Sequence, residues 1–285
     1  MNHQLSYIPK QEIERILSFE IDDITRADLI SIISRINTLY MINNAGSGHI
    51  GTSFSSMDLI SYIFFKFKIT NEKQTDLFFS SKGHDAPAIY SIMSIFELIE
   101  FDKIHSLRRL NGLPGHPDIE TDGIITNTGS LGMGISKAKG FIQSSRLEGI
   151  NRNVFVLLGD GELQEGQIWE SLRSASNDRM GELYIIVDNN KIQSDNWVEL
   201  TSHNDNLTRK FESFGCKVAE INGHDFSEIQ YTFENLQHIN DKPKVIIANT
   251  IKGNGVSFMH ADSNIRESDY EYPYHSGALN NEEYL

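Results

Sequence analysis

Two short polar motifs in the middle of the chain carry residue types that suit a metal ion and a phosphate. Gly-Asp-Gly stands at 159–161, directly after an apolar run, and Asp-Asn-Asn at 188–190 closes the next run. Ligands of open α/β sheets bind outside the carboxyl ends of the strands, and glycine lets the backbone approach a ligand closely. If the two strands are neighbours, Asp160 and Asn190 offer side-chain oxygens to one crevice. With a loop carbonyl, they suit a hard cation that keeps room for phosphate oxygens and water.

The histidines give a second set of candidates. Four of the ten directly follow a glycine, namely His49, His84, His116 and His224. A glycine beside an imidazole lets the backbone come close to a ligand and leaves the ring exposed at a turn. We expect His49, His84 and His116 to lie in turns between helical segments and to share one cleft.

Helical periodicity surrounds the first of these turns. Apolar residues repeat at helical spacing from 22 to 45, where Thr25 with Asp28 resembles a capping box. A second periodic stretch covers 57–67, after a glycine-rich turn. The pattern predicts two helices joined by the turn that carries His49.

Short apolar runs predict the strands, and they lie at 153–158, 183–187 and 244–248. Continuous apolar runs of this length suit strands buried on both faces, as in a parallel sheet covered by helices. A helix-like stretch at 164–177 separates the first two, which is typical of a right-handed βαβ unit. We therefore predict an α/β fold with a doubly wound, mostly parallel sheet and helices on both faces.

No linker or repeat divides the chain before its polar, acidic and tyrosine-rich end. We expect one domain over residues 1–260 and a C-terminal arm over 261–285, which contacts a partner subunit or the substrate entrance. Glycines 46, 48 and 51 fit G-x-G-x-x-G, but they follow a helix where a dinucleotide-binding motif must follow a strand. A Walker loop is excluded because the sequence contains no Gly-Lys dipeptide.

Composition limits the class of protein. The 285 residues include 39 acidic and 25 basic side chains, a net charge of −14, which argues against a nucleic-acid partner. The one cysteine, Cys216, excludes an internal disulfide framework and suits a reducing compartment. The N-terminus lacks a secretion signal, and the longest apolar run, 59–69, contains two lysines and is too short to span a bilayer. We expect a cytoplasmic protein with no membrane partner.

Longer motifs resemble the N-terminal, pyrophosphate-binding part of transketolase. The text GDGELQEGQIWES closed by VDNNKIQSD, within 159–195, resembles the family's thiamine-diphosphate motif. SGHIGTSFSSMDLI, SSKGHDAPAIYS, LPGHPD, TNTGSLGMGISKAKG and TIKGNGVSFM extend the similarity over most of the chain. The resemblance implies the thiamine-diphosphate-binding fold.

The same resemblance implies a cofactor site. Asp160, Asn190 and the Ile192 carbonyl would bind magnesium (or calcium or manganese), with two diphosphate oxygens and a water as the remaining ligands. The residues implied in thiamine-diphosphate binding are His84, Leu131, Gly132, Gly159, Asp160, Gly161, Glu162, Asn190, Ile192 and His275. His275 is preferred over His260 for the family's last histidine, because an acidic, tyrosine-rich insertion separates the two in this chain.

Five residues are implied in catalysis, namely His49, His84, His116, His275 and Glu165. The histidines would bind cofactor and substrate hydroxyls, and Glu165, with Glu170 nearby, would link two active sites across a dimer interface. From the residues alone, the preferred interpretation of both glutamates is a solvated first helical turn, which the helix dipole favours.

The resemblance also implies a missing half, because transketolases place the cofactor between two domains and take a catalytic glutamate from the second. We expect a separate C-terminal subunit in an α2β2 assembly that transfers a two-carbon ketol unit between sugars or sugar phosphates. The alternatives are a subunit like that of 2-oxo-acid dehydrogenase or deoxyxylulose-phosphate synthase, or a non-catalytic regulatory subunit that binds thiamine diphosphate.

Overall fold

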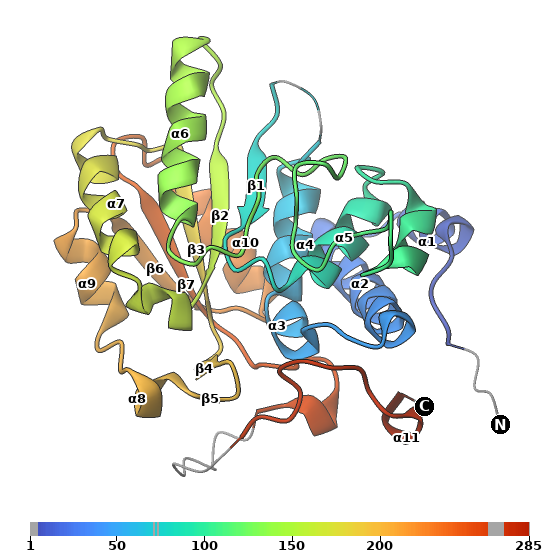
Figure 1. The fold of residues 1–285 in the computed structure, drawn as a ribbon. Coiled ribbons are helices and arrows are strands. Elements are labelled where there is room, and N and C mark those ends of the chain that lie inside the picture. Colours follow the sequence, from blue (N-terminus) through green and yellow to red (C-terminus); the bar gives the residue numbers. More distant parts are fainter. Residues whose placement is uncertain (1–4, 71, 73, 262–270, 285) are drawn as a thin grey trace.

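A five-stranded parallel sheet forms the centre of the molecule (Figure 1). The computed structural model describes residues 5–70, 72, 74–261 and 271–284. The strands run in the order β1-β2-β3-β7-β6, and β4 and β5 form a separate antiparallel hairpin. Their bounds are β1 Leu77–Ser80, β2 Val154–Gly159, β3 Leu183–Asn189, β4 Ile192–Gln193, β5 Asn196–Trp197, β6 Lys217–Asn222 and β7 Lys244–Asn249. The predicted parallel sheet is confirmed.

Helices cover both faces of this sheet (Figure 1). Helices α6 (Gly134–Leu147), α7 (Gly166–Asn177) and α9 (Leu207–Ser213) lie on one face, and α2 (Asp23–Ala45), α4 (Met57–Lys66), α5 (Ala86–Ile95) and α10 (Phe226–Leu236) lie on the other. The remaining helices are α1 (Lys10–Leu17), α3 (Ile50–Ser55), α8 (Val198–Thr201) and α11 (Asn281–Tyr284), with 3-10 turns at Phe101–Ser106, Gly161–Gln164 and Ser257–Met259.

Strand β2 shows why the apolar runs are continuous. Its alternate residues Val154, Val156 and Leu158 belong to the core beneath α6, α7 and α9. Phe155 and Leu157 point the other way, into the core beneath α2, α4 and α10. Because successive side chains of a strand face opposite sides, every residue must be apolar when both faces are buried.

Some element boundaries differ from the sequence prediction. The helix predicted from residue 22 is α2, but its cap is Asp22, whose carboxylate accepts the Thr25 backbone N–H at 3.0 Å. The predicted capping box of Thr25 and Asp28 is therefore wrong. A 3-10 turn over Gly161–Gln164 precedes α7, which begins at Gly166 and not at 164.

Two strands of the central sheet, β1 and β6, were not predicted, and neither was the short β4–β5 hairpin. Strand β1 has only four residues, and three of the six residues of β6 at the sheet edge are exposed, so neither gives an apolar run of useful length. His84 consequently follows a strand, not a helix as expected.

The described end of the chain, residues 271–284, returns across the carboxyl end of the sheet. The Gly51 N–H donates to the Tyr274 carbonyl at 3.1 Å, and the Gly277 N–H donates to the Gly48 carbonyl at 2.9 Å. The division into a domain and an arm at residue 261 stays a prediction, and most of the insertion before His275, residues 262–270, lies outside the described residues.

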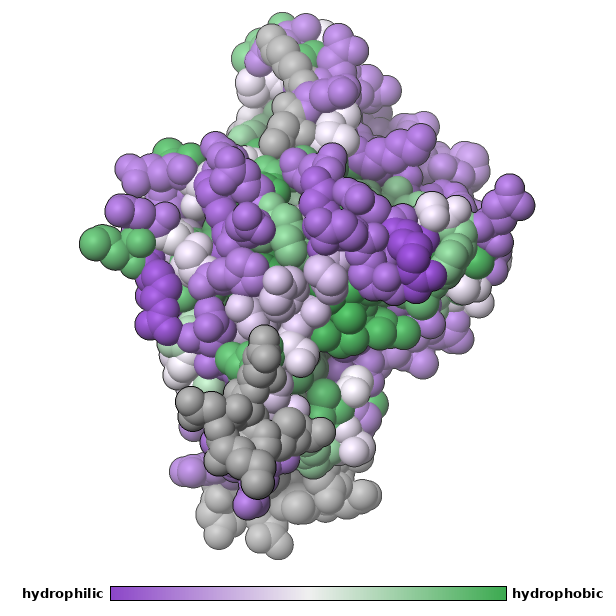
Figure 2. Space-filling model, turned by 90° about the vertical axis from the view of Figure 1, so that its right-hand side faces the viewer, coloured by the Kyte–Doolittle hydropathy of each residue, from purple (hydrophilic) through white to green (hydrophobic). Residues whose placement is uncertain are grey.

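The side of the molecule that carries α1 and both termini is mainly hydrophilic, with one compact hydrophobic area (Figure 2). Within the described part of the chain, no helix combines the length and apolar character that a bilayer crossing requires.

Candidate functional site

Loops at the carboxyl ends of β1, β2, β3 and β7 surround a cavity of about 440 Å³. Strands β2 and β3 are neighbours, with Gly159 opposite Asp188, so the two polar motifs lie side by side. The cavity is lined by His49, Thr52, Lys82, His84, His116, Gly129, Leu131, Gly159, Asp160, Gly161, Glu162, Gln164, Glu165, Asn190, Ile192, Gln193, Ser194, Lys252 and His275. Every residue predicted for the site is on this wall except Gly132.

Four histidines from distant parts of the chain form a cluster at this cavity. The ring of His49 lies 5.2 Å from that of His84, 5.1 Å from that of His275 and 6.5 Å from that of His116, between centroids. Gly129 permits this packing, since a Cβ there would lie 2.8 Å from the His116 ring. The expected shared cleft for the first three histidines is confirmed, and His275 joins them.

Burial keeps the histidine cluster neutral at pH 7. It lowers the pKa of His49 to about 4 and that of His275 to about 4, and neighbouring positive charges add to the effect. Burial also lowers the pKa of His84, to about 2. The His84 Nδ1 lies 3.1 Å from the Lys82 carbonyl, so it carries the proton and leaves Nε2 as an acceptor. Neutral imidazoles can both donate to and accept from hydroxyl groups.

The cluster predicts lower stability in acid. A histidine with a pKa of about 4 in the folded state and 6.5 in the unfolded state binds protons mainly when unfolded between these values, so the free energy of unfolding falls as the pH drops. We expect His49→Gln to reduce the loss between pH 7 and 5 by roughly 1 kcal/mol, after allowance for solvent screening. Urea titrations at both pH values measure this difference. The exposed His238, changed to Gln, is the control, and an equal effect in both variants would contradict the prediction.

Asp160 lies in the cavity wall at the end of β2. It is 3% exposed, and its two carboxylate oxygens accept the N–H groups of Gly161 at 2.7 Å and Lys191 at 2.5 Å. Burial raises the pKa of Asp160 to about 6, and the nearby Asp188 charge adds to the shift. A buried carboxylate in this setting favours a cation beside it.

Two further oxygens line the same wall. The Asn190 side-chain oxygen accepts the Ile192 N–H at 3.1 Å, and the Ile192 carbonyl lies 3.3 Å from the Lys252 ammonium. Carboxylate, amide and carbonyl oxygens are the donors that magnesium and calcium prefer. No cluster of three or more His, Cys, Asp or Glu suitable for a metal occurs among the described residues, as expected for a set with one carboxylate.

Glu162 supports the loop that carries Leu131. It is buried, and one of its carboxylate oxygens accepts the Gly132 N–H at 2.9 Å and the Ser81 hydroxyl, while the other accepts the Gly159 N–H at 3.3 Å. Gly132 therefore reaches the site through Glu162, while Leu131 lines the cavity directly. Burial raises the pKa of Glu162, and these hydrogen-bond donors oppose the shift only in part.

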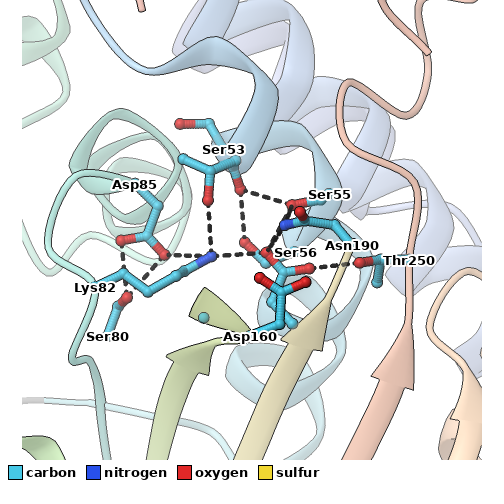
Figure 3. Close-up of polar contacts among 12 residues, drawn as sticks. Ser53, Ser55, Ser56, Ser80, Lys82, Asp85, Asp160, Asn190 and Thr250 are labelled. Carbon is cyan, nitrogen blue, oxygen red and sulfur yellow. Dashed lines mark hydrogen bonds and ion pairs between the residues drawn. The ribbon is translucent and has the colours of Figure 1, made fainter. Parts of the chain in front are cut away.

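A buried ionic network forms part of the cavity wall (Figure 3). The Lys82 ammonium donates to Asp188 at 2.8 Å and to the Thr52 hydroxyl at 3.0 Å, and it lies 3.5 Å from Asp85. Asp188 also accepts the Thr250 and Ser55 hydroxyls, at 2.5 and 2.7 Å. The Asn190 amide donates to Asp188 at 3.1 Å, so the network fixes which way the Asn190 oxygen points.

Lys252 is a second buried lysine, and it was not predicted as a site residue. It is 2% exposed, donates to the Ser194 carbonyl at 2.7 Å and lies 3.4 Å from His275 Nδ1. Burial lowers the pKa of Lys252 to about 8, although the Asp160 charge opposes this shift. The one feature of the sequence that could have indicated Lys252 is its place in the motif TIKGNG, shortly after the strand predicted at 244–248.

The remaining candidate histidines and glutamates differ in whether they line the cavity. His260 is exposed and does not line the cavity, whereas His275 does. Glu165 lines the cavity and is exposed, and Glu170 is exposed on α7. His224 lies elsewhere, where its Nδ1 is 2.8 Å from Asp58 and its Nε2 accepts the Ile251 N–H at 2.8 Å, so it has a structural role.

Comparison with known proteins identifies the family. A family model described as the thiamine diphosphate binding domain of transketolase matches residues 25–268. The chain belongs to the transketolase family. It is 35% identical over 224 residues to an apulose-4-phosphate transketolase subunit from Actinobacillus succinogenes, covering 76% of this chain and 81% of that protein. It is 34% identical over 228 residues to a 6-deoxy-6-sulfo-D-fructose transketolase subunit from Clostridium sp. strain MSTE9, covering 78% of this chain and 83% of that protein.

Longer transketolases match only in part. Human transketolase is 30% identical over 230 residues, which are 78% of this chain but 36% of the human protein. The crystal structure of Campylobacter jejuni transketolase superposes with a TM-score of 0.81 and 28% identity over 93% of this chain and 42% of that one. This transketolase chain therefore corresponds in extent to the N-terminal subunit of divided members of the family.

Proposed function

We propose that this chain is the N-terminal subunit of a two-chain transketolase, which transfers a two-carbon ketol unit from a ketose donor to an aldose acceptor. The observation that carries the proposal is the convergence of His49, His84, His116 and His275 on the cavity that also contains Asp160 and Asn190. Relatives named as transketolase subunits, similar over most of their length, support it.

The cavity suits thiamine diphosphate held through magnesium. We propose Asp160, Asn190 and the Ile192 carbonyl as the protein ligands of the metal, since these oxygens line one wall. His49 Nδ1 is buried and has no hydrogen-bond partner among the described residues, so the site has an unfilled polar position for a ligand. When bound, thiamine diphosphate supplies the carbon nucleophile that carries the two-carbon unit.

The chain's own groups would then bind and orient the sugars. Neutral His49 and His116 can each donate to one hydroxyl and accept from another, and His275, whose Nδ1 faces the Lys252 ammonium, can donate from Nε2, which suits a polyhydroxylated substrate. Lys252 and Asp160 lie on the same wall and balance each other's charge beside the diphosphate position. We propose that the donor is a ketose and the acceptor an aldose, each with or without a phosphate group.

The remaining functions fall to a partner chain. We propose a C-terminal subunit that supplies the catalytic glutamate and covers the open side of the cavity, in an α2β2 assembly. Glu165 is consistent with this assembly because it lines the cavity and is nevertheless exposed in the single chain. A second copy of this chain would cover it.

A reconstitution assay tests the proposal. The purified chain is mixed with thiamine diphosphate and magnesium, with and without the C-terminal-half protein from the same source, and ketol transfer is measured. We expect activity only when both chains are present. Activity from this chain alone would contradict the two-chain model, and carbon dioxide release from pyruvate without ketol transfer would favour a 2-oxo-acid enzyme.

A further inference from the structure

Tyr272 is the most deeply buried residue of the chain's C-terminal segment, residues 271–279. Its side chain is 3% exposed, although the stretch around it is polar and acidic. Its hydroxyl donates to the Met259 carbonyl at 2.7 Å, and its backbone N–H donates to the Asp195 carbonyl at 2.6 Å. Both the side chain and the backbone of Tyr272 are thus fixed to other loops.

Two glycines form the slot that holds this ring. A Cβ at Gly51 would lie 2.8 Å from Tyr272 Cε1, and one at Gly253 would lie 2.6 Å from the Tyr272 hydroxyl. The Gly253 N–H also donates to the Gly51 carbonyl at 3.0 Å, which joins the two walls of the slot. No other residue type at these two positions leaves room for the tyrosine.

The ring touches the parts of the cavity wall proposed to face the metal and the diphosphate. Tyr272 forms a small core cluster with Ile192 and Trp197 of the β4–β5 hairpin. The Lys252 ammonium lies 5.2 Å from the centre of the Tyr272 ring, within the range of a cation–π contact. One side chain therefore joins the hairpin that carries the Ile192 carbonyl to the loop that carries Lys252.

His275 follows three residues later. Its ring lies 5.1 Å from that of His49 and 6.2 Å from that of His84, and its Nδ1 is 3.4 Å from the Lys252 ammonium. The segment around His275, residues 273–276, is held at one end by the Tyr272 slot. At the other end the Gly277 N–H donates to the Gly48 carbonyl at 2.9 Å. The position of His275 thus depends on where Tyr272 is anchored.

We propose that Tyr272 is a positioning residue of the cofactor site, which anchors residues 271–279 across the Ile192 and Lys252 loops and holds His275 in the histidine cluster. The proposal rests on the proposed function for what the cluster binds. It does not make Tyr272 catalytic, because the ring contacts no group expected to react. It gives a physical reason for one of the tyrosines in this tyrosine-rich end of the sequence.

Two measurements on the full chain test the proposal. The first follows modification of His275 by diethyl pyrocarbonate with peptide mass spectrometry and needs no cofactor. The second is calorimetric titration with thiamine diphosphate and magnesium. We expect Tyr272→Ala to speed His275 modification and to weaken binding by about 10- to 100-fold, as for other groups that orient a ligand's direct contacts. Tyr272→Phe, which keeps the ring, should stay close to the unchanged chain in both.

Further variants separate the possible outcomes. Tyr272→Leu fills the slot but loses the contact with Lys252, so it should resemble Tyr272→Ala and replaces it if the alanine variant does not fold. Tyr231→Ala removes an exposed ring on α10 that does not line the cavity, and it should change neither readout greatly. Equal behaviour of Tyr272→Leu and Tyr272→Phe would overturn the proposal, as would equal losses in Tyr231→Ala. If the unchanged chain binds no thiamine diphosphate even when the C-terminal subunit is present, the proposed function fails, and the modification of His275 still decides the role of Tyr272.

Discussion

Asp160→Asn is expected to abolish magnesium-dependent binding of thiamine diphosphate while leaving the fold intact. The carboxylate is the one charged oxygen among the three proposed metal ligands, and its loss should weaken binding by more than about a hundredfold. Ketol transfer by the reconstituted enzyme should fall at least in parallel. Calorimetry of the chain with thiamine diphosphate, with and without magnesium, measures the effect.

The Asp160→Asn substitution should change the stability of the fold little, although it removes cofactor binding. The folded-state pKa of Asp160 is raised to about 6, above its value in the unfolded chain, because burial and Asp188 disfavour the charge. Ionisation of Asp160 therefore opposes folding at pH 8, and removing the charge offsets the hydrogen bond that is lost. We expect the Tm of the metal-free chain to change by only a few degrees. The exposed Asp178, changed to Asn, should alter neither binding nor Tm, and full magnesium-dependent binding by Asp160→Asn would rule out the proposed metal site.

Much of the fold could be predicted because its central strands are buried on both faces. Strands β2, β3 and β7 gave continuous apolar runs, and their order along the sheet brought Asp160 and Asn190 together as expected. Strand β1 could not be found in this way. Its four residues are too few to distinguish a strand from a loop, and so the strand-end position of His84 was missed.

The candidate site was predicted less completely, for a physical reason. Histidine and aspartate beside glycine indicate a site from local sequence, but a lysine in sequence normally indicates a solvated charge. Lys82 and Lys252 are each 2% exposed, and only the packing of β1, β3 and the loop after β7 shows that carboxylates and carbonyls surround them. Tyr272 was missed for the same reason, because its slot is formed by Gly51 and Gly253, which are distant in the sequence.

Lys82→Met is expected to have the largest effect on stability. Burial alone would lower the pKa of Lys82, but the Asp188 and Asp85 charges raise it, so the lysine stays charged in the folded protein. Its removal leaves two carboxylates that are each 0% exposed without their counter-ion. Loss of one partner from a buried ion pair costs about 3–5 kcal/mol, which lowers the Tm of a chain this size by on the order of 10 °C.

Two controls identify the cause of this loss. Lys10→Met breaks an ion pair with Glu97 of 2.6 Å, but both side chains are largely exposed, at 44% and 68%, so the loss of stability should be far smaller than at Lys82. The double variant Lys82→Met with Asp188→Asn removes one uncompensated charge and should recover part of the lost stability. Thermal unfolding of the four proteins provides the comparison. Equal losses of stability in Lys82→Met and Lys10→Met would contradict the proposed role of the buried network. The Lys82–Asp188 ion pair can hold Asn190 in place only if its charges are shielded from water.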